Sequence, residues 1–316
     1  MNKISQKIFL PLIIVIICLF AGTGLVWADN SYLRFAQVSD VHFDSKAKKS
    51  KNFNRNGRLL AYSGELLKDA IDQINNTENI DFVIFTGDQI NSPRESELRK
   101  FLEIINTLKC PWYLIAGNHD IAVGNPDTGT SLKASRPAKL PFSFSLPLRN
   151  KLKYFQVADS YNKNFKAGKD YYSFSPKKGF LVIVMDGVIN SYITANGYFD
   201  KKQLNWLEEQ LNSNKNSKVI IAQHFPLVEP QKSITHRVLN ADKYLETLKK
   251  YDNIIAILSG HYHKSKITKV GNVTHISAPA LVQYPNAFRI LTITDKNGVV
   301  EINTELKTTR LEELKR

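Results

Sequence analysis

The chain has 316 residues, of which 43% are hydrophobic and 23% charged, and its formal net charge is +14. This composition is that of a globular protein that can bury a sizeable core, and it excludes a low-complexity or repeat protein. A basic surface would attract phosphorylated or otherwise anionic partners. The lysines are scattered, however, and no nucleic-acid motif is present, so we do not expect nucleic acid to be the partner.

The first 28 residues predict a signal peptide. Two lysines precede an uncharged apolar run, and Ala28 ends the segment with the small residue that a signal peptidase prefers. An uncleaved membrane anchor is the alternative, because residues 8–28 are just long enough to span a bilayer. In both cases we expect residues 29–316 to form one exported domain, periplasmic or extracellular, which contacts a membrane only if the segment is retained.

Apolar runs and amphipathic segments alternate along the first part of this domain. Short buried runs predict strands, and apolar residues at helical spacing predict helices. In chain order, we expect a strand at 33–39, a helix at 58–75, a strand at 82–86, a helix at 96–108 and a strand at 112–116. Such alternation is typical of a parallel sheet with helices packed on its faces.

Residues 124–169 interrupt this alternation. They are rich in Pro, Ser, Gly and Lys and predict a long loop region on the substrate side. Regular structure then resumes with strands at 171–175 and 180–186, a helix capped by Asp200, a strand at 219–222, a helix at 241–251 and a strand at 254–258. Residues 267–305 read as short strands that could close a second sheet. We therefore predict an α/β fold in which a two-sheet β-sandwich is flanked by helices.

Polar residues follow directly after five of the predicted strands. They are Asp40 and His42, then Asp88, the run Asn118-His119-Asp120, then His224, and the pair His261 and His263. In open α/β sheets, ligands bind where the loops at the carboxyl ends of the strands converge. Imidazole, carboxylate and carboxamide oxygen together suit Zn, Mn or Fe. One such motif is common by chance, but five at strand ends predict a single metal site.

The same motifs resemble, in order and without a gap, the signature of the calcineurin-like metallophosphoesterases. They are Asp40-Val-His42, Gly87-Asp88, Gly117-Asn118-His119-Asp120, His224 and Gly260-His261-Tyr-His263. The resemblance implies a two-sheet sandwich with helices outside and a centre of two divalent ions, Mn, Fe or Zn. By this resemblance, Asp40, His42 and His263 would hold the first metal, Asn118, His224 and His261 the second, and Asp88 would bridge them.

Physical chemistry supports a bridging carboxylate. Two cations about 3.5–4 Å apart repel each other, so a shared carboxylate and hydroxide are needed between them. Such a centre hydrolyses phosphate monoesters or diesters, since hydroxide attacks phosphorus in line with the departing alcohol. By the resemblance, His119 faces the substrate and would stabilise the phosphoryl charge or protonate the leaving oxygen. Asp120 would orient His119 and raise its pKa.

The motifs leave several alternatives open. The purple acid phosphatase branch of the family has a tyrosine ligand where this chain has Asn91, so a branch resembling cyclic-nucleotide phosphodiesterases and broad-specificity phosphatases fits better. We expect a small phosphate-ester substrate, with monoester and diester both open, as is the oligomeric state. An inactive metal-binding or interaction module on the same fold, and an exported nuclease, are the alternative functions. We expect a structural role for His275 and an exposed position for His236.

Overall fold

The computed structural model describes residues 31–48, 57–121, 158, 170–189 and 194–311. The predicted signal peptide lies outside these residues, and so does the predicted loop region apart from Ala158. Within the described ranges, no helix is long and apolar enough to cross a membrane.

The first sheet has five strands in the order β11-β10-β1-β2-β3. Three adjacent strands are parallel: β1 (Ser31–Val38), β2 (Phe82–Phe85) and the edge strand β3 (Trp112–Leu114). Strand β10 (Ala287–Lys296) pairs antiparallel with β1, and β11 (Val299–Thr308) pairs antiparallel with β10. All four residues of β2 are buried, as expected for a strand covered on both faces.

The second sheet has six strands in the order β4-β5-β6-β7-β9-β8. Four of them are parallel: β5 (Phe180–Val184), β6 (Lys218–Ala222), β7 (Ile254–Ser259) and β9 (Val273–Ser277). The antiparallel edge strands are β4 (Tyr172–Phe174) and β8 (Lys266–Val270). The sequence therefore predicted both the two-sheet architecture and its mainly parallel centre.

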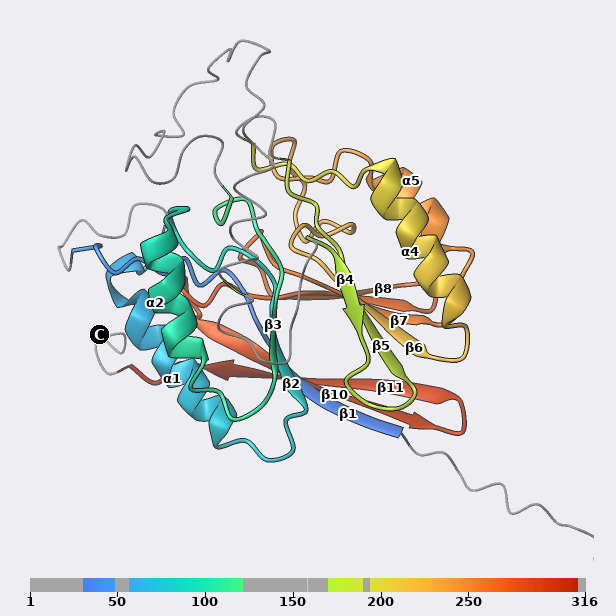
Figure 1. The fold of residues 1–316 in the computed structure, drawn as a ribbon, viewed down its shortest axis with the longest axis horizontal. Coiled ribbons are helices and arrows are strands. Elements are labelled where there is room, and N and C mark those ends of the chain that lie inside the picture. The colour runs from blue at the N-terminus through green and yellow to red at the C-terminus, as the bar shows by residue number, and fades with distance from the viewer. Residues whose placement is uncertain (1–30, 49–56, 122–157, 159–169, 190–193, 312–316) are drawn as a thin grey trace, which may run out of the picture.

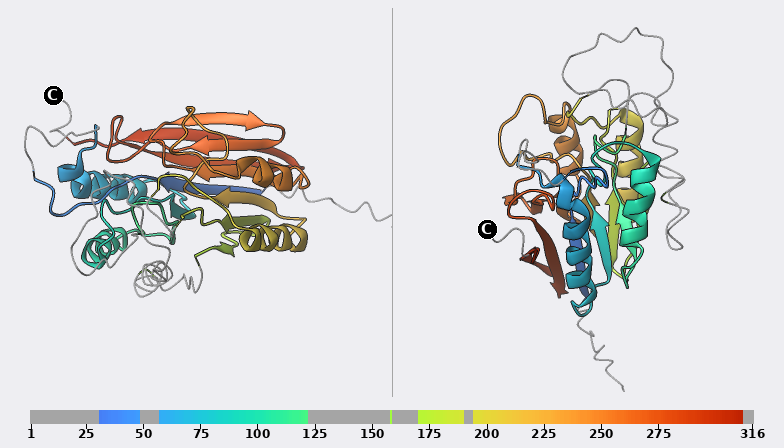
Figure 2. Two further views of the ribbon diagram at one scale, coloured as in Figure 1. Left: turned by 90° about the horizontal axis from the view of Figure 1, so that it is seen from above. Right: turned by 90° about the vertical axis from the view of Figure 1, so that its left-hand side faces the viewer.

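Alternating side chains give the molecule its layers. On β1, Leu33 and Phe35 belong to the core between the sheets, whereas Ala36 and Val38 belong to the core under the helices. Figure 1 shows α1 (Ser63–Asn75) and α2 (Glu95–Ile105) beside the first sheet, and α4 (Lys201–Ser213) and α5 (Ala241–Leu248) beside the second. The two views of Figure 2 show the same layers edge-on. As predicted, the Asp200 side chain caps α4, accepting from the Gln203 amide at 2.8 Å.

Two expectations about elements need correction. The predicted helix at 58–75 begins later, with a 3-10 turn at Leu60–Tyr62 leading into α1, because Arg58 pairs with Gln283 in a β-bridge. The C-terminal strands do not all join the second sheet: β8 and β9 do, but β10 and β11 are ten residues each and extend the first. Pairing with β1 covers its otherwise open edge.

Candidate metal centre

The residues expected to bind metal follow β1, β2, β3, β6 and β7, at the carboxyl ends of parallel strands in both sheets. Hydrogen bonds join the loops across the two sheets. The amide of His261 donates to Asp40 Oδ2 at 3.0 Å, and Nδ1 of His224 lies 2.8 Å from the carbonyl oxygen of Thr86. The open ends of the two sheets therefore meet at one place, as the motif positions predicted.

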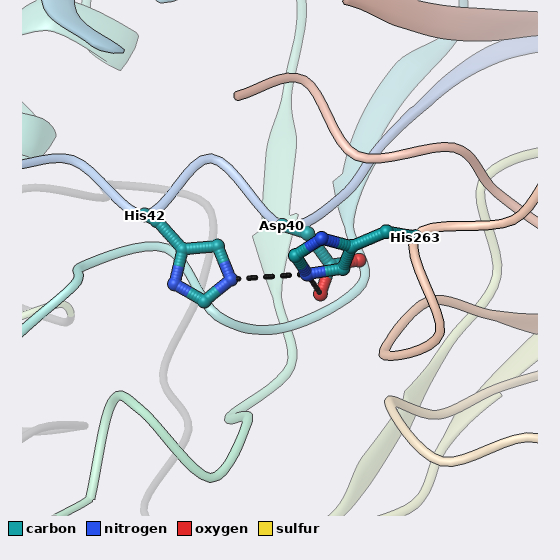
Figure 3. A group of neighbouring side chains, drawn as sticks. All are labelled: Asp40, His42 and His263. Atoms are coloured by element: carbon teal, nitrogen blue, oxygen red, sulfur yellow. Dashed lines mark hydrogen bonds and ion pairs between the residues drawn. The ribbon is translucent and has the colours of Figure 1, made fainter. Parts of the chain in front are cut away.

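One group of possible ligands is Asp40, His42 and His263 (Figure 3). Nε2 of His42 lies 3.2 Å from Nε2 of His263, which lies 3.3 Å from Oδ1 of Asp40. Asp40 and His42 are fully buried. These are the three residues that the family resemblance assigned to a first metal.

A second group is Asp88, His224 and His261, in which Nδ1 of His261 lies 3.2 Å from Nε2 of His224. Asp88 connects the two groups. Its Oδ2 lies 3.5 Å from Nε2 of His224 and also 3.5 Å from Nε2 of His42. One carboxylate oxygen is thus equidistant from a histidine of each group, which is the position that a bridging ligand requires.

The backbone is strained at the same residues. Positive φ angles occur at five of the expected ligands: Asp40 (51°), His42 (44°), Asp88 (54°), His261 (73°) and His263 (55°). The other non-glycine residues with positive φ in the described ranges are all asparagines. Such strain costs on the order of 1–3 kcal/mol per residue and persists mainly at functional sites. The strain therefore marks these loops as shaped for ligation.

Two glycines allow the loops to approach closely. A Cβ on Gly117 would lie 2.2 Å from Oδ1 of Asp88, and a Cβ on Gly87 would lie 2.2 Å from Nδ1 of His224. Gly87 also has a φ of 97°, which a residue with a side chain rarely adopts. The glycines of these motifs thus make room for the ligands of neighbouring loops.

Hydrogen bonds fix which nitrogen each histidine presents. Nδ1 of His263 lies 2.6 Å from Oε1 of Gln283, and Nδ1 of His224 lies 2.8 Å from the Thr86 carbonyl. Because each of these oxygens only accepts, a neutral ring at either position carries its hydrogen on Nδ1 and turns the Nε2 lone pair into the cluster. Sequence reasoning missed Gln283, since it belongs to no motif.

Charge and burial set the protonation of the site. Burial raises the pKa of Asp88, but His224 and His119 outweigh this and hold it well below its usual value. Burial lowers the pKa of His42 well below its usual value, with a contribution from His119, and does the same for His261. Burial also lowers the pKa of His224, but Asp88 outweighs it and raises that pKa to about 9. Without metal, the proton on His224 therefore stands in for a cation beside Asp88.

The residues fit two bound cations. Nitrogens that share one tetrahedral cation at about 2.0–2.1 Å lie about 3.3 Å apart, which matches the 3.2 Å separation in each histidine pair. Oδ1 of Asn118 is buried and has no hydrogen-bond partner among the described residues. A buried oxygen of this kind needs a donor or a cation, and Asn118 is an expected ligand of the second metal. The site is therefore a candidate two-metal centre.

His119 lies beside the first group, its ring centroid 4.5 Å from that of His42. The expected contact with Asp120 is wrong. The carboxylate of Asp120 instead accepts from the amides of Ile90 (3.0 Å) and Gly117 (2.8 Å). Burial, followed by the charge of Asp88, raises the pKa of Asp120 well above its usual value.

The backbone of Asn91 orients His119. Its carbonyl oxygen lies 3.1 Å from Nδ1 of His119, while its side-chain amide donates to Asp44 at 3.0 Å. Asn91 therefore stabilises the loop after β2 rather than reaching outward. His119 is only partly buried, so its ring can meet a substrate. His119 also forms a possible ligand group with His42 and Asp88. The metal content of a protein in which His119 is replaced decides between a substrate-facing role and a role as a metal ligand.

Three residues outside the motifs complete the description. His236 is exposed, as expected, and its ring lies 5.3 Å from that of His261. His275 lies on β9, where burial lowers its pKa to about 4. Nη1 of Arg58 lies 3.5 Å from Nδ1 of His42. Arg58 was missed because its segment was predicted to be the start of a helix.

Comparison with known proteins agrees with this site. The calcineurin-like phosphoesterase family matches residues 33–265, which include every expected ligand. The chain therefore belongs to this family. Since the family, the ligand groups and the relatives described next agree, it is a metal-dependent phosphoesterase, a hydrolase of phosphoester bonds.

Two of the relatives cover most of the chain. A probable glycerophosphodiester phosphodiesterase GpdQ of Arcobacter nitrofigilis is 26% identical over 250 residues, 77% of this chain and 76% of that protein. A manganese-dependent ADP-ribose/CDP-alcohol diphosphatase of Arabidopsis thaliana is 23% identical over 298 residues, 79% of this chain and 86% of that protein. Among solved structures, a dimetal phosphatase from Danio rerio has a TM-score of 0.58 at 16% identity, covering 86% of this chain and 98% of that one. That similarity confirms the fold.

Proposed function

We propose that this chain hydrolyses small phosphodiesters with two divalent metal ions. The observation that carries the proposal is the position of Asp88, whose Oδ2 is equidistant from a histidine of each ligand group. Asp40, His42 and His263 would hold one ion, and Asn118, His224 and His261 the other. When bound, such ions activate water and neutralise the charge of the phosphoryl group.

The residues of the chain have distinct tasks in this reaction. Asp88 would offset the charge of both cations at once, and so reduce their mutual repulsion. Gln283 and Thr86 hold His263 and His224 with their Nε2 atoms inward. His119, oriented by the Asn91 carbonyl, donates a hydrogen bond to the phosphoryl group or a proton to the leaving oxygen.

Relatives support a diester as the substrate. Besides the two described above, a probable cyclic nucleotide phosphodiesterase of Colwellia psychrerythraea is 26% identical over 239 residues. The names of all three relatives describe substrates in which a phosphorus atom carries two ester or anhydride substituents. One of them is manganese-dependent, which supports Mn as a metal alongside Fe and Zn. The chain has Asn91 where purple acid phosphatases have a tyrosine ligand, so we place it outside that branch.

A metal and substrate panel tests the proposal. The purified chain is stripped with a chelator, reloaded with Mn, Zn or Fe, and assayed on bis(p-nitrophenyl) phosphate and p-nitrophenyl phosphate. We expect about two ions per chain, loss of hydrolysis on chelation, recovery with metal, and faster turnover of the diester. Hydrolysis that survives complete removal of metal would overturn the metal mechanism. A faster monoester reaction would overturn the diester assignment alone.

We also propose that residues 29–316 are exported as one domain after cleavage behind Ala28. The charged start, apolar run and small residue of the N-terminal segment support this. N-terminal sequencing of the protein from the extracytoplasmic fraction should begin at Asp29. A full-length chain in the membrane fraction would instead indicate that residues 8–28 serve as an anchor.

A further inference from the structure

The loop between β7 and β8 carries two of the expected metal ligands, and side chains of the first sheet hold it at both ends. At its start, Nε2 of Gln37 on β1 donates to the carbonyl oxygen of Ser259 at 3.0 Å. At its end, Nη2 of Arg289 on β10 donates to Oγ of Ser265 at 2.5 Å. Gln37 and Arg289 are direct partners in the pairing of β1 with β10. Two neighbouring side chains of one sheet thus hold the metal-binding loop of the other.

Arg289 lies in the core between the two sheets. It faces the same side of β10 as Leu291 and Ile293, which belong to that core, and only 4% of its surface is exposed. No carboxylate in the described ranges pairs with it. Its partners are two hydroxyls, that of Ser265 and, at 3.0 Å from Nη1, that of Thr304 on β11. A buried charge without a counter-ion is costly, and an apolar residue at such a position is often as stable or more so. Fold stability alone therefore does not account for an arginine here.

The backbone of this loop needs to be held in place. The φ angle of His263 is 55°, a conformation that residues with a side chain disfavour, and such a conformation persists only where the surrounding contacts fix it. Before His263, the amide of His261 donates to Oδ2 of Asp40 at 3.0 Å. After His263, the contact of Ser265 with Arg289 connects the chain to the first sheet again. The strained ligand therefore lies between two attachments to the first sheet.

We infer that Arg289 is a positioning residue of the metal centre, which fixes the end of the β7–β8 loop against the first sheet and so places His263 opposite Asp40. This inference rests on the proposed function. Asp40 and His42 follow a strand of the first sheet, whereas His263 follows a strand of the second, so the first ligand group is complete only while the two sheets keep their relative position. The planar guanidinium suits this task, because its fork contacts two hydroxyls at once. The first ion should depend on this contact most, since the Asp40 carboxylate holds the backbone of the other ligand of the loop directly.

Metal titration tests this inference without turnover. The metal-free wild type, Arg289→Met, Ser265→Ala and the control Thr304→Val are titrated with Mn in competition with a metal-binding dye, and denaturant unfolding measures the stability of each. Thr304→Val is the matched control, because it removes the other hydroxyl that the guanidinium contacts and leaves the Ser265 contact in place. We expect Arg289→Met and Ser265→Ala to weaken the binding of one of the two ions about 10- to 100-fold, and Thr304→Val to change it less than about threefold. Arg289→Lys, which keeps the charge but not the planar fork, should fall between the wild type and Arg289→Met.

A double variant separates the contact from a general loss of stability. If Arg289 acts through Ser265, the protein with Arg289→Met and Ser265→Ala together should bind Mn as weakly as Arg289→Met alone, because the second change removes nothing further. Losses of affinity that add up, or an equal loss in Thr304→Val, would mean that Arg289 only stabilises the fold, and would overturn the inference.

The remaining outcomes are also decisive. Wild-type affinity in Ser265→Ala would overturn the inference as well. Should Arg289→Met fail to fold, the comparison of Ser265→Ala with Thr304→Val decides alone, since each removes one hydroxyl partner of the same guanidinium. A wild type that binds two ions but hydrolyses no phosphoester with any of the three metals would contradict the proposed function, while the affinities still decide the role of Arg289.

Discussion

Oε1 of Gln283 lies 2.6 Å from Nδ1 of His263. Because an amide oxygen can only accept, this contact selects the tautomer of His263 whose Nε2 is free to bind a cation. The contact connects a residue without a motif to the last ligand of the signature. Its removal should therefore weaken metal binding although no ligand is lost.

We expect Gln283→Leu to reduce metal affinity about 10- to 100-fold, the range found for residues that orient metal ligands. Competition with a metal-binding dye measures this directly. Gln283→Glu keeps an acceptor at the same place and should retain most of the affinity. Gln73→Leu is the matched control, since Gln73 donates to Asp69 on α1. If Gln283→Leu binds metal as tightly as the control does, the orienting role is wrong.

Asp88→Asn should reduce metal content more than any other single ligand change. Oδ2 of Asp88 lies 3.5 Å from the ring nitrogen of a histidine in each group, and the substitution removes the negative charge that both cations would share. His263→Ala, which alters the first group alone, should leave one ion bound. Elemental analysis of the purified variants checks this. Two ions in Asp88→Asn, or none in His263→Ala, would contradict the bridging assignment.

His119→Ala should slow catalysis without loss of metal. General acid catalysis contributes about 10²–10⁴-fold, so a loss in that range is expected for a diester with a poor leaving group. An ester whose leaving alcohol is already acidic needs no proton, and its loss should be smaller. Comparison of a methyl and a p-nitrophenyl leaving group provides the measurement. Equal losses, or a reduced metal content, would show that His119 is a ligand and not the acid.

Acid should destabilise the fold in part through His275. Burial lowers its pKa from 6.5 to about 4, so at intermediate pH the unfolded chain binds a proton there that the folded chain does not. The stabilisation is therefore complete above pH 6.5 and is lost as the pH falls toward 4. About 2–3 kcal/mol of unfolding free energy is involved.

Denaturant unfolding of the metal-free protein at pH 7, 5.5 and 4 measures this effect. His275→Leu removes the titrating group and should lose less unfolding free energy over that interval than the wild type. A parallel decline in the two proteins would show that His275 does not contribute to the acid sensitivity.

Much of the fold could be predicted because its signals are local. The run at 82–86 is uniformly apolar, and it became a strand buried on both faces, β2. The periodic segment before it became α1. The motif residues could be predicted as neighbours for the same reason, since each follows a strand and parallel strands end at the same edge. Their grouping into two metal sites came from the resemblance to a family.

The remaining features depend on contacts between distant segments. The apolar residues of strand β10 would alternate in the same way in either sheet. Only its pairing with β1 assigns it to the first sheet. His119 and Asp120 are neighbours in sequence, yet the turn directs Asp120 to buried amides and leaves His119 partly exposed. Gln283 and Arg58 reach the metal ligands through a β-bridge that neither local sequence encodes. Sequence by itself thus determined which residues could bind metal, because strand periodicity and motif spacing are short-range. The tertiary structure decided which residues orient those ligands, because such contacts form only when both sheets are assembled.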